Sequence, residues 1–135
     1  MVSLKKLAGV SAPRIPYKII SDEIVGVNFD LSIVFVDEDE SRRLNFEYRK
    51  VDSPTNILSF PLDESSGELV FNTKLSTREA KELKIDLRSC VTYLFIHGLL
   101  HPKGHDHGPK MTKEETTLVK KHCKKDTDLI AENFL

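Results

Sequence analysis

Four of the five histidines in this chain lie within eleven residues, and the spacing of three of them fits a helix followed by a turn. His97 and His101 are four residues apart, which places both imidazoles on one face of an α-helix. Pro102 disfavours the helical region for the residue before it, and Gly104 tolerates positive φ, so the chain can reverse there and return His107. The spacing therefore predicts a three-histidine metal site at the C-terminal end of a helix.

The ligand type indicates the kind of metal site. Three neutral imidazoles, without a thiolate or a ligating carboxylate, leave a zinc ion with its full charge and an open fourth position, as in catalytic zinc sites. A His-rich loop with incidental metal affinity is the plain alternative. We expect His105 to be a pocket-wall or surface residue, with a fourth ligand as the alternative. Asp106 is a candidate acceptor that orients a ligating ring, or else a residue that holds its own loop.

The residue after the first histidine argues against a peptidase. Zinc peptidases with the H-E-x-x-H-x-x-G-x-x-H pattern share this spacing, and they place a glutamate general base directly after the first histidine. This chain has Gly98 at that position. The sequence therefore disfavours peptidase chemistry by that route.

Length and composition limit the remaining possibilities. A chain of 135 residues is long enough for one domain with a substantial core, which we expect to span residues 1–135. No apolar run approaches the ~20 residues of a membrane span, so we expect a cytoplasmic protein without membrane association. Cys90 and Cys123 are far apart and predict reduced thiols rather than a disulfide. Cys90 lies seven residues before His97 and so shares its helix face. We expect it to be a small core residue, with a neighbour of the site as the alternative.

The net charge of −1 lacks the basic signature usual for a nucleic-acid-binding domain. Basic residues nonetheless gather in two stretches, namely Arg42, Arg43, Arg49 and Lys50, and then Lys110, Lys113, Lys120, Lys121, Lys124 and Lys125. Such runs are most often solvated helix faces. They permit a phosphate-bearing substrate without establishing one.

The first half of the chain predicts three strands and a helix. Short β-branched and aromatic runs indicate strands at 31–36, at 57–60, where Pro61 closes the strand, and at 68–71. A turn over 63–67 would let the last two pair as neighbours. Residues 39–48 predict a helix with Asp39 or Ser41 as its cap. Residues 1–30 carry no clear pattern.

The second half predicts helices. Ser76 and Glu79 match a capping box that opens a helix reaching about residue 83. Asp86 can cap a largely buried helix over 87–101, and a final helix is expected from 112 or 113 to 135. Strands followed by helices indicate an α+β fold, a small mixed sheet packed with helices, with the metal site at the C-terminal end of a core helix.

Two ordered motifs, LNxxYRxxDxPTxILSFP at 44–61 and HGxLHxxGxDH at 97–107, with GELV at 67–70 between them, closely resemble the YbeY family. The resemblance covers roughly residues 31–115. It implies a zincin-like fold and a single-strand-specific, metal-dependent endoribonuclease. Family members act in ribosomal RNA maturation, notably at the 3′ end of the small-subunit RNA, and in ribosome quality control. The implied partners are single-stranded or ribosomal RNA, the small ribosomal subunit and assembly factors.

Carried over by position, the resemblance implies zinc ligands at His97, His101 and His107 and a functional arginine at Arg49. A guanidinium is permanently charged and binds phosphate through two hydrogen bonds, so Arg49 could stabilise charge that develops in the transition state. An exposed arginine at a helix end is the alternative. Imidazole ligands suit several divalent ions, so the physiological metal stays open among zinc, nickel, cobalt and manganese.

Four positions depart from the residues that the family usually has. Asn56 and Glu68 stand where Asp is common, and Pro102 and His105 stand where Leu and Tyr are common. None of the four is an implied ligand. Glu68 is a possible substrate or ligand-orienting residue. The general base stays open between a metal-bound hydroxide, Glu68 and Asp63.

Two other function classes remain open. A zinc hydrolase of amides or small molecules would use the same three histidines, and the near-neutral charge favours it over a nuclease. A non-catalytic ribosome assembly factor would bind ribosomal components through the basic stretches. Substrate assays separate these classes from a ribonuclease.

Overall fold

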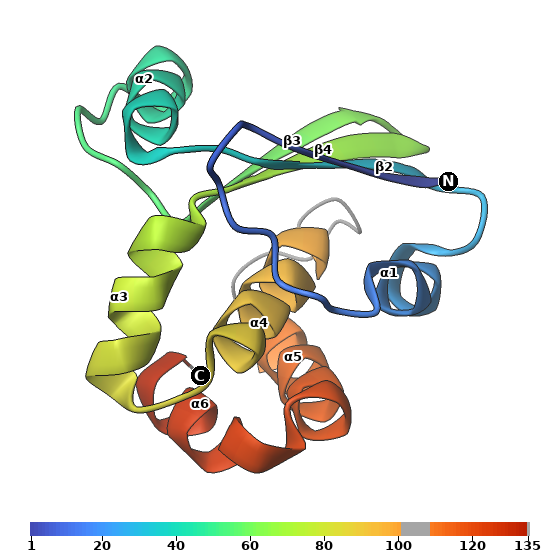
Figure 1. The fold of residues 1–135 in the computed structure, drawn as a ribbon. Helices are drawn as coiled ribbons and strands as arrows, with labels where there is room; N and C mark the ends of the chain where they lie inside the picture. The colour runs from blue at the N-terminus through green and yellow to red at the C-terminus, as the bar shows by residue number, and fades with distance from the viewer. Residues whose placement is uncertain (101–108, 135) are drawn as a thin grey trace.

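A four-stranded mixed sheet forms the middle layer of the molecule (Figure 1). The computed structural model describes residues 1–100 and 109–134. The strands are β1 (Val2–Lys6), β2 (Asp30–Phe35), β3 (Ile57–Asp63) and β4 (Ser66–Phe71), in the order β1-β2-β4-β3. β1, β2 and β4 run parallel, and β3 pairs antiparallel with β4 at one edge. The three predicted strands are confirmed, and so is the pairing of the last two.

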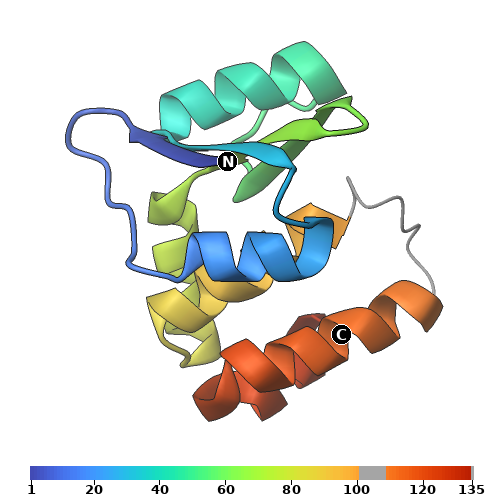
Figure 2. The same ribbon diagram turned by 90° about the vertical axis from the view of Figure 1, so that its right-hand side faces the viewer.

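Helices cover both faces of this sheet. They are α1 (Tyr17–Val25), α2 (Glu38–Arg49), α3 (Thr73–Leu83), α4 (Leu87–Leu100), α5 (Pro109–His122) and α6 (Thr127–Phe134), with a short 3-10 helix, η1 (Lys124–Asp126), between the last two. Figures 1 and 2 show α2 on one face, α1 and α4 on the other, and α5 and α6 beyond α4. The predicted α+β class is confirmed. None of the helices that the structure describes is long and apolar enough to span a bilayer.

Successive side chains of a strand point to opposite faces of the sheet, so the apolar residues form two clusters. Ile33, Phe35 and Leu69 are completely buried on the face that α4 covers, within the main core. On the opposite face, a small cluster under α2 contains Leu58 and Val70. The strands therefore bury side chains on both faces, and edge strand β3 lies between α2 and α4.

α4 is the central helix of the main core, as its dense apolar sequence predicts. Ten of its residues are buried, among them Val91, Phe95 and Leu99. Cys90 is also buried here, so it is a core residue. Cys90 and Cys123 are both free thiols, as expected, and burial raises the pKa of each to about 12.

The structure corrects two of the predicted helix caps. α2 is capped by Asp37, whose Oδ1 accepts a hydrogen bond from the Glu40 amide at 2.8 Å, rather than by Asp39 or Ser41. α3 begins at Thr73, so the predicted capping box at 76–79 lies inside the helix. In both cases a suitable cap residue stands shortly before the predicted one, because several polar residues compete for the same role.

Two predicted element ends are also wrong. β3 continues past Pro61 to Asp63, with a register irregularity between them. Proline is tolerated there because β3 is an edge strand and need not donate on its outer side. The expected single C-terminal helix is divided at Cys123 into α5, η1 and α6, because buried Cys123 and Asp126 form a compact turn there.

Candidate active site

A cleft of about 870 Å³ opens along edge strand β3, between the C-terminal end of α2 and the C-terminal half of α4. Its described lining comes from residues 48–49, 55–61, 93–94 and 97–98. Arg49 and His97, two of the residues predicted to act together, both line this cleft. Among the described lining residues there is no carboxylate. The described wall therefore suits an anionic ligand.

Arg49 is exposed on the α2 side of the cleft. It is the last residue of α2, which ends where Lys50 adopts a left-handed conformation with φ of 60°. The neighbouring Arg42 and Arg43 both form salt bridges with carboxylates outside the cleft. Among the residues that the structure describes, no salt bridge involves Arg49. Two of the four residues of the predicted basic stretch are thus paired with carboxylates, and Arg49 is the one that lines the cleft.

Polar residues of α2 and of the 44–61 motif hold the loop that leads from α2 into β3. The Ser41 hydroxyl donates to the Thr55 carbonyl at 2.7 Å and accepts from the Thr55 amide at 3.0 Å. The buried Asn45 amide donates to the Ser53 carbonyl at 2.9 Å. These bonds fix the loop against α2, and thereby fix Arg49 relative to β3.

His97 lies on the opposite wall, in the last turn of α4. Its side chain is 23% exposed, and Nδ1 forms a hydrogen bond with Oε1 of Glu115 on α5. Glu115 is buried, with 6% of its side chain exposed. Histidines that bind metals usually give their other ring nitrogen to a carboxylate or carbonyl in this way. With Nδ1 engaged by Glu115, Nε2 is the nitrogen through which His97 would bind a metal ion.

The donor chemistry at His97 fits a metal site, although the remaining predicted ligands cannot be placed. His101, His105, Asp106 and His107 lie outside the described residues. Within residues 1–100 and 109–134 no cluster of three potential ligands occurs. The three-histidine set therefore stays a prediction. Its support in the structure is a cleft-lining histidine held by a buried carboxylate.

The other candidate carboxylates are not among the described residues that line the cleft. Glu68 is on β4, where its Oε1 accepts from the Ser32 hydroxyl at 3.4 Å, and it is not among the cleft-lining residues. Asp63 is exposed at the end of β3, and the amide of Ser65 donates to it and holds the pKa of its carboxyl below the usual range. The choice of general base stays a prediction.

Comparison with known proteins assigns the family. The sequence pattern of the family described as Endoribonuclease YbeY matches residues 14–127. The chain belongs to the YbeY endoribonuclease family. This membership confirms the predicted family and the predicted enzyme class, a nuclease acting on RNA phosphodiester bonds.

Individual relatives agree with the family assignment. Endoribonuclease YbeY of Aliarcobacter butzleri is 40% identical over 101 residues, which cover 67% of this chain and 72% of that protein. The protein of the same name from Campylobacter jejuni is 41% identical over 98 residues, covering 67% and 73%. For the Finegoldia magna protein the identity is 37% over 87 residues, covering 59% of this chain and 57% of that protein. The match therefore spans little more than half of some YbeY relatives.

A solved structure shares the fold. The solution structure of TM1509 from Thermotoga maritima superposes with a TM-score of 0.67 at 24% sequence identity. The alignment covers 98% of this chain and 96% of that one. The arrangement of sheet and helices is thus one that a solved protein also adopts.

The structure adds to the YbeY motif a residue that sequence reasoning missed. Glu115 follows His97 by eighteen residues and matches no local spacing rule for metal sites. The sequence carried one sign of its burial. Glu115 lies on the same helix face as Leu118 and Val119, three and four residues later, and both of these are buried. A carboxylate on the buried face of a helix requires a partner, and His97 is that partner.

Gly98 occupies the position where related zinc patterns carry glutamate, and packing explains why a larger residue is disfavoured. A Cβ atom at Gly98 would lie 2.8 Å from Cδ1 of Ile57 and 3.1 Å from Cδ2 of Leu69. The Ser59 hydroxyl also donates to the Gly98 carbonyl at 3.2 Å. Because α4 lies so close to the sheet here, a glutamate at this position would have to displace the side-chain ends of Ile57 and Leu69.

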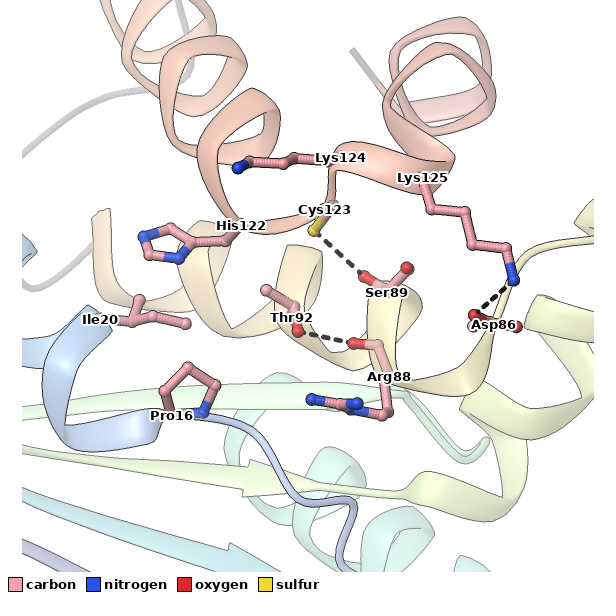
Figure 3. A pocket seen from close by; sticks show the side chains of 10 residues that line it. All are labelled: Pro16, Ile20, Asp86, Arg88, Ser89, Thr92, His122, Cys123, Lys124 and Lys125. Carbon is pink, nitrogen blue, oxygen red and sulfur yellow. Dashed lines mark hydrogen bonds and ion pairs between the residues drawn. The ribbon is translucent and has the colours of Figure 1, made fainter.

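A second hollow of about 230 Å³ lies elsewhere on α4, near the junction of α5 and η1 (Figure 3). Its lining includes Arg88, Lys124 and Lys125, and Lys125 forms a 3.1 Å salt bridge with Asp86. His122 contacts the carboxylate of Glu23 at 3.2 Å. Among the residues that the structure describes, this pocket shares none with the cleft and includes neither Arg49 nor His97.

Proposed function

We propose that this YbeY family member is a metal-dependent endoribonuclease that cleaves single-stranded RNA in the cleft along β3. His97, His101 and His107 would hold one zinc ion, and Arg49 would bind the scissile phosphate. The observation that carries the proposal is the pairing of Arg49 with a Glu115-held His97 in one cleft whose described lining contains no carboxylate. The zincin-like character of the fold and the full ligand set rest on the resemblance to the family.

A bound zinc ion would supply Lewis-acid polarisation of a phosphoryl oxygen and lower the pKa of the attacking water. The residues of the chain do the rest. Arg49 binds the phosphate through its planar guanidinium and stabilises the negative charge that grows on it. Glu115 holds the His97 ring in one orientation and keeps Nδ1 occupied. Tyr93 lines the cleft beside His97, and burial raises its pKa, so its phenol stays neutral.

We propose ribosomal RNA as the cellular substrate, with maturation of the small-subunit 3′ end and ribosome quality control as the processes served. The small subunit and its assembly factors would be the partners, and the cytoplasm the location. The names of the relatives support RNA as the substrate class. The more specific assignments rest on the family resemblance.

Cleavage of one RNA in two forms tests the proposal. The purified chain, with its metal content measured, is incubated with a single-stranded RNA and with the same strand in a duplex, each with and without a chelator. We expect cleavage of the single strand only, loss with chelator, and recovery when zinc is added back. Cleavage that survives chelation would contradict a role for the metal in the reaction. Equal cleavage of the duplex would contradict the preference for single strands.

The chemistry of the cleaved ends distinguishes two reaction routes. A 2′,3′-cyclic phosphate assigns the attack to the neighbouring ribose hydroxyl. Ends without a cyclic phosphate assign it to water. Mass spectrometry of short products separates the two.

A zinc hydrolase of amides is the second candidate, and the edge position of β3 favours it. β3 pairs with β4 on one side and lines the cleft, so an extended peptide could add to its outer edge. Gly98 argues against the peptidase route, because no general base stands after His97. Cleavage of denatured protein without any cleavage of RNA would select this candidate.

A further inference from the structure

An aromatic ring lies at the rim of the cleft, directly beside the cationic side chain. Tyr48 precedes Arg49 at the end of α2, lines the cleft, and is 59% exposed. Its ring centroid is 4.8 Å from that of Phe60 on β3, with 64° between the ring planes. This edge contact orients the Tyr48 ring while more than half of the residue stays open to solvent.

Tyr48 is not needed to fill the core. Leu44 and Tyr48 are four residues apart on α2 and so share a helix face, and Leu44 packs against the small cluster under α2. One turn later, the Tyr48 ring packs on that of Phe60 and stays 59% exposed. A large aromatic side chain that is oriented by a neighbouring ring and more than half exposed is suited to bind a flat ligand.

The charge of the cleft limits which ligand this can be. Arg49 follows Tyr48 in the chain, and the described lining holds no carboxylate. A ligand that satisfies both residues carries a flat ring next to an anionic group. A nucleotide unit of single-stranded RNA meets both requirements, since its base can stack on an aromatic ring while its phosphate contacts arginine.

We propose that Tyr48, supported by Phe60, is the stacking platform for an unstacked nucleobase next to the phosphate that Arg49 binds. This inference rests on the proposed function and deepens it by naming a substrate subsite. Bases in a duplex already stack on their neighbours and cannot cover the Tyr48 ring without being extruded. The platform therefore accounts for a preference for single strands, and it is tolerant of sequence because every base has an aromatic face.

Binding of RNA to the metal-free protein tests the platform separately from cleavage. The probe is a short single-stranded RNA with one 2-aminopurine, whose fluorescence is quenched on stacking, measured in the presence of chelator. We expect Tyr48→Ala to weaken binding about 5- to 150-fold, the range of one lost stacking contact, and to abolish the quenching. Tyr48→Phe keeps the ring and should retain both the affinity and the quenching.

Phe46 offers a matched control on the same helix. It is an aromatic residue with 54% exposure that does not line the cleft. Phe46→Ala should leave RNA binding within about twofold of the wild type, because isolated surface substitutions have small effects. Tyr48→Leu serves as a second variant that keeps an apolar side chain of substantial size without a π face, and it should lose the quenching. Circular dichroism checks that each variant is folded.

The outcomes separate the platform from the proposed reaction. RNA binding by Tyr48→Ala as tight as that of Phe46→Ala overturns the platform, and so does a Tyr48→Phe variant as weak as Tyr48→Ala. If the wild type cleaves RNA and Tyr48→Ala keeps its KM, the platform fails while the proposed function stands. If metal-loaded wild type cleaves no RNA but Tyr48 variants lose binding and quenching, the proposed reaction fails while the nucleobase site stands.

Discussion

On the α2 side of the cleft, Tyr48 and Arg49 are exposed and project from the end of a helix, whereas on the α4 side His97 is mostly buried and Glu115 holds its ring. Exposed side chains can adjust to a flexible strand of RNA. A metal ligand needs a fixed ring direction, and burial with a hydrogen-bonded carboxylate provides it. Changes on the α4 side should therefore alter metal binding, and changes on the α2 side should alter RNA binding or turnover with the metal retained.

The largest expected effect is on the α4 side. His97→Ala removes one of three proposed ligands, so the protein should lose stoichiometric zinc, and RNA cleavage should fall to background. Metal analysis and a cleavage assay measure both. His122→Ala is the matched control, because His122 lies in the second pocket and contacts Glu23. A His97→Ala protein that retains its zinc contradicts the proposed metal site.

On the α2 side, Arg49→Ala should lower kcat about 10²- to 10³-fold, the range for one lost donor to transition-state charge, while zinc content stays unchanged. Arg49→Lys should recover only part of the rate, because an ammonium cannot bind phosphate through a planar fork. Arg42→Ala removes a nearby arginine that pairs with Asp52 outside the cleft, and it should have little effect. Normal turnover by Arg49→Ala would exclude its assigned role.

Replacing the carboxylate behind His97 should have an intermediate effect. Glu115→Ala should weaken zinc binding about 10- to 100-fold, the usual range for a residue that orients a metal ligand. Glu115→Gln keeps a neutral acceptor for Nδ1–H, so its zinc affinity should fall less than that of Glu115→Ala. Competition with a chelator measures the affinity, and Glu82→Gln, an exposed glutamate on α3, is the control. If Glu115→Ala unfolds more easily but keeps wild-type zinc affinity, the residue only supports packing.

The smallest effect on the chemistry is expected from Gly98→Ala. The added Cβ would meet Ile57 at 2.8 Å, so overpacking should lower the free energy of unfolding by about 1–3 kcal/mol. Urea denaturation measures the change. Adding Ile57→Val removes the Cδ1 atom that clashes, and the double variant should be more stable than Gly98→Ala alone. No recovery in the double variant would mean that the clash lies elsewhere.

The proposed site residues could be named from the sequence alone, whereas several element boundaries could not. His97 and Arg49 are predictable because their motifs are local, and the structure places both on one cleft. The contact of His97 with Glu115 was not predictable, because it depends on how α5 packs against α4. Asp37 was missed as a cap because Asp39 and Ser41 follow it closely and have similar propensities.

The elements without periodic patterns were the hardest to predict. β1 is a short strand with four exposed residues, so it lacks the alternation that marks a half-buried strand. The break at Cys123 depends on burial of that thiol against α4, where it donates to the Ser89 carbonyl at 3.7 Å. Such contacts arise only once distant segments are packed together.

The contact between His97 and Glu115 also joins the helix before residues 101–108 to the helix after them. α4 and α5 are thus held together by packing and by this contact between side chains. Because the His97 ring is already held in place, it gives up little side-chain freedom on binding an ion. The apoprotein should accordingly remain folded, unlike small zinc domains in which the ion provides the folding free energy.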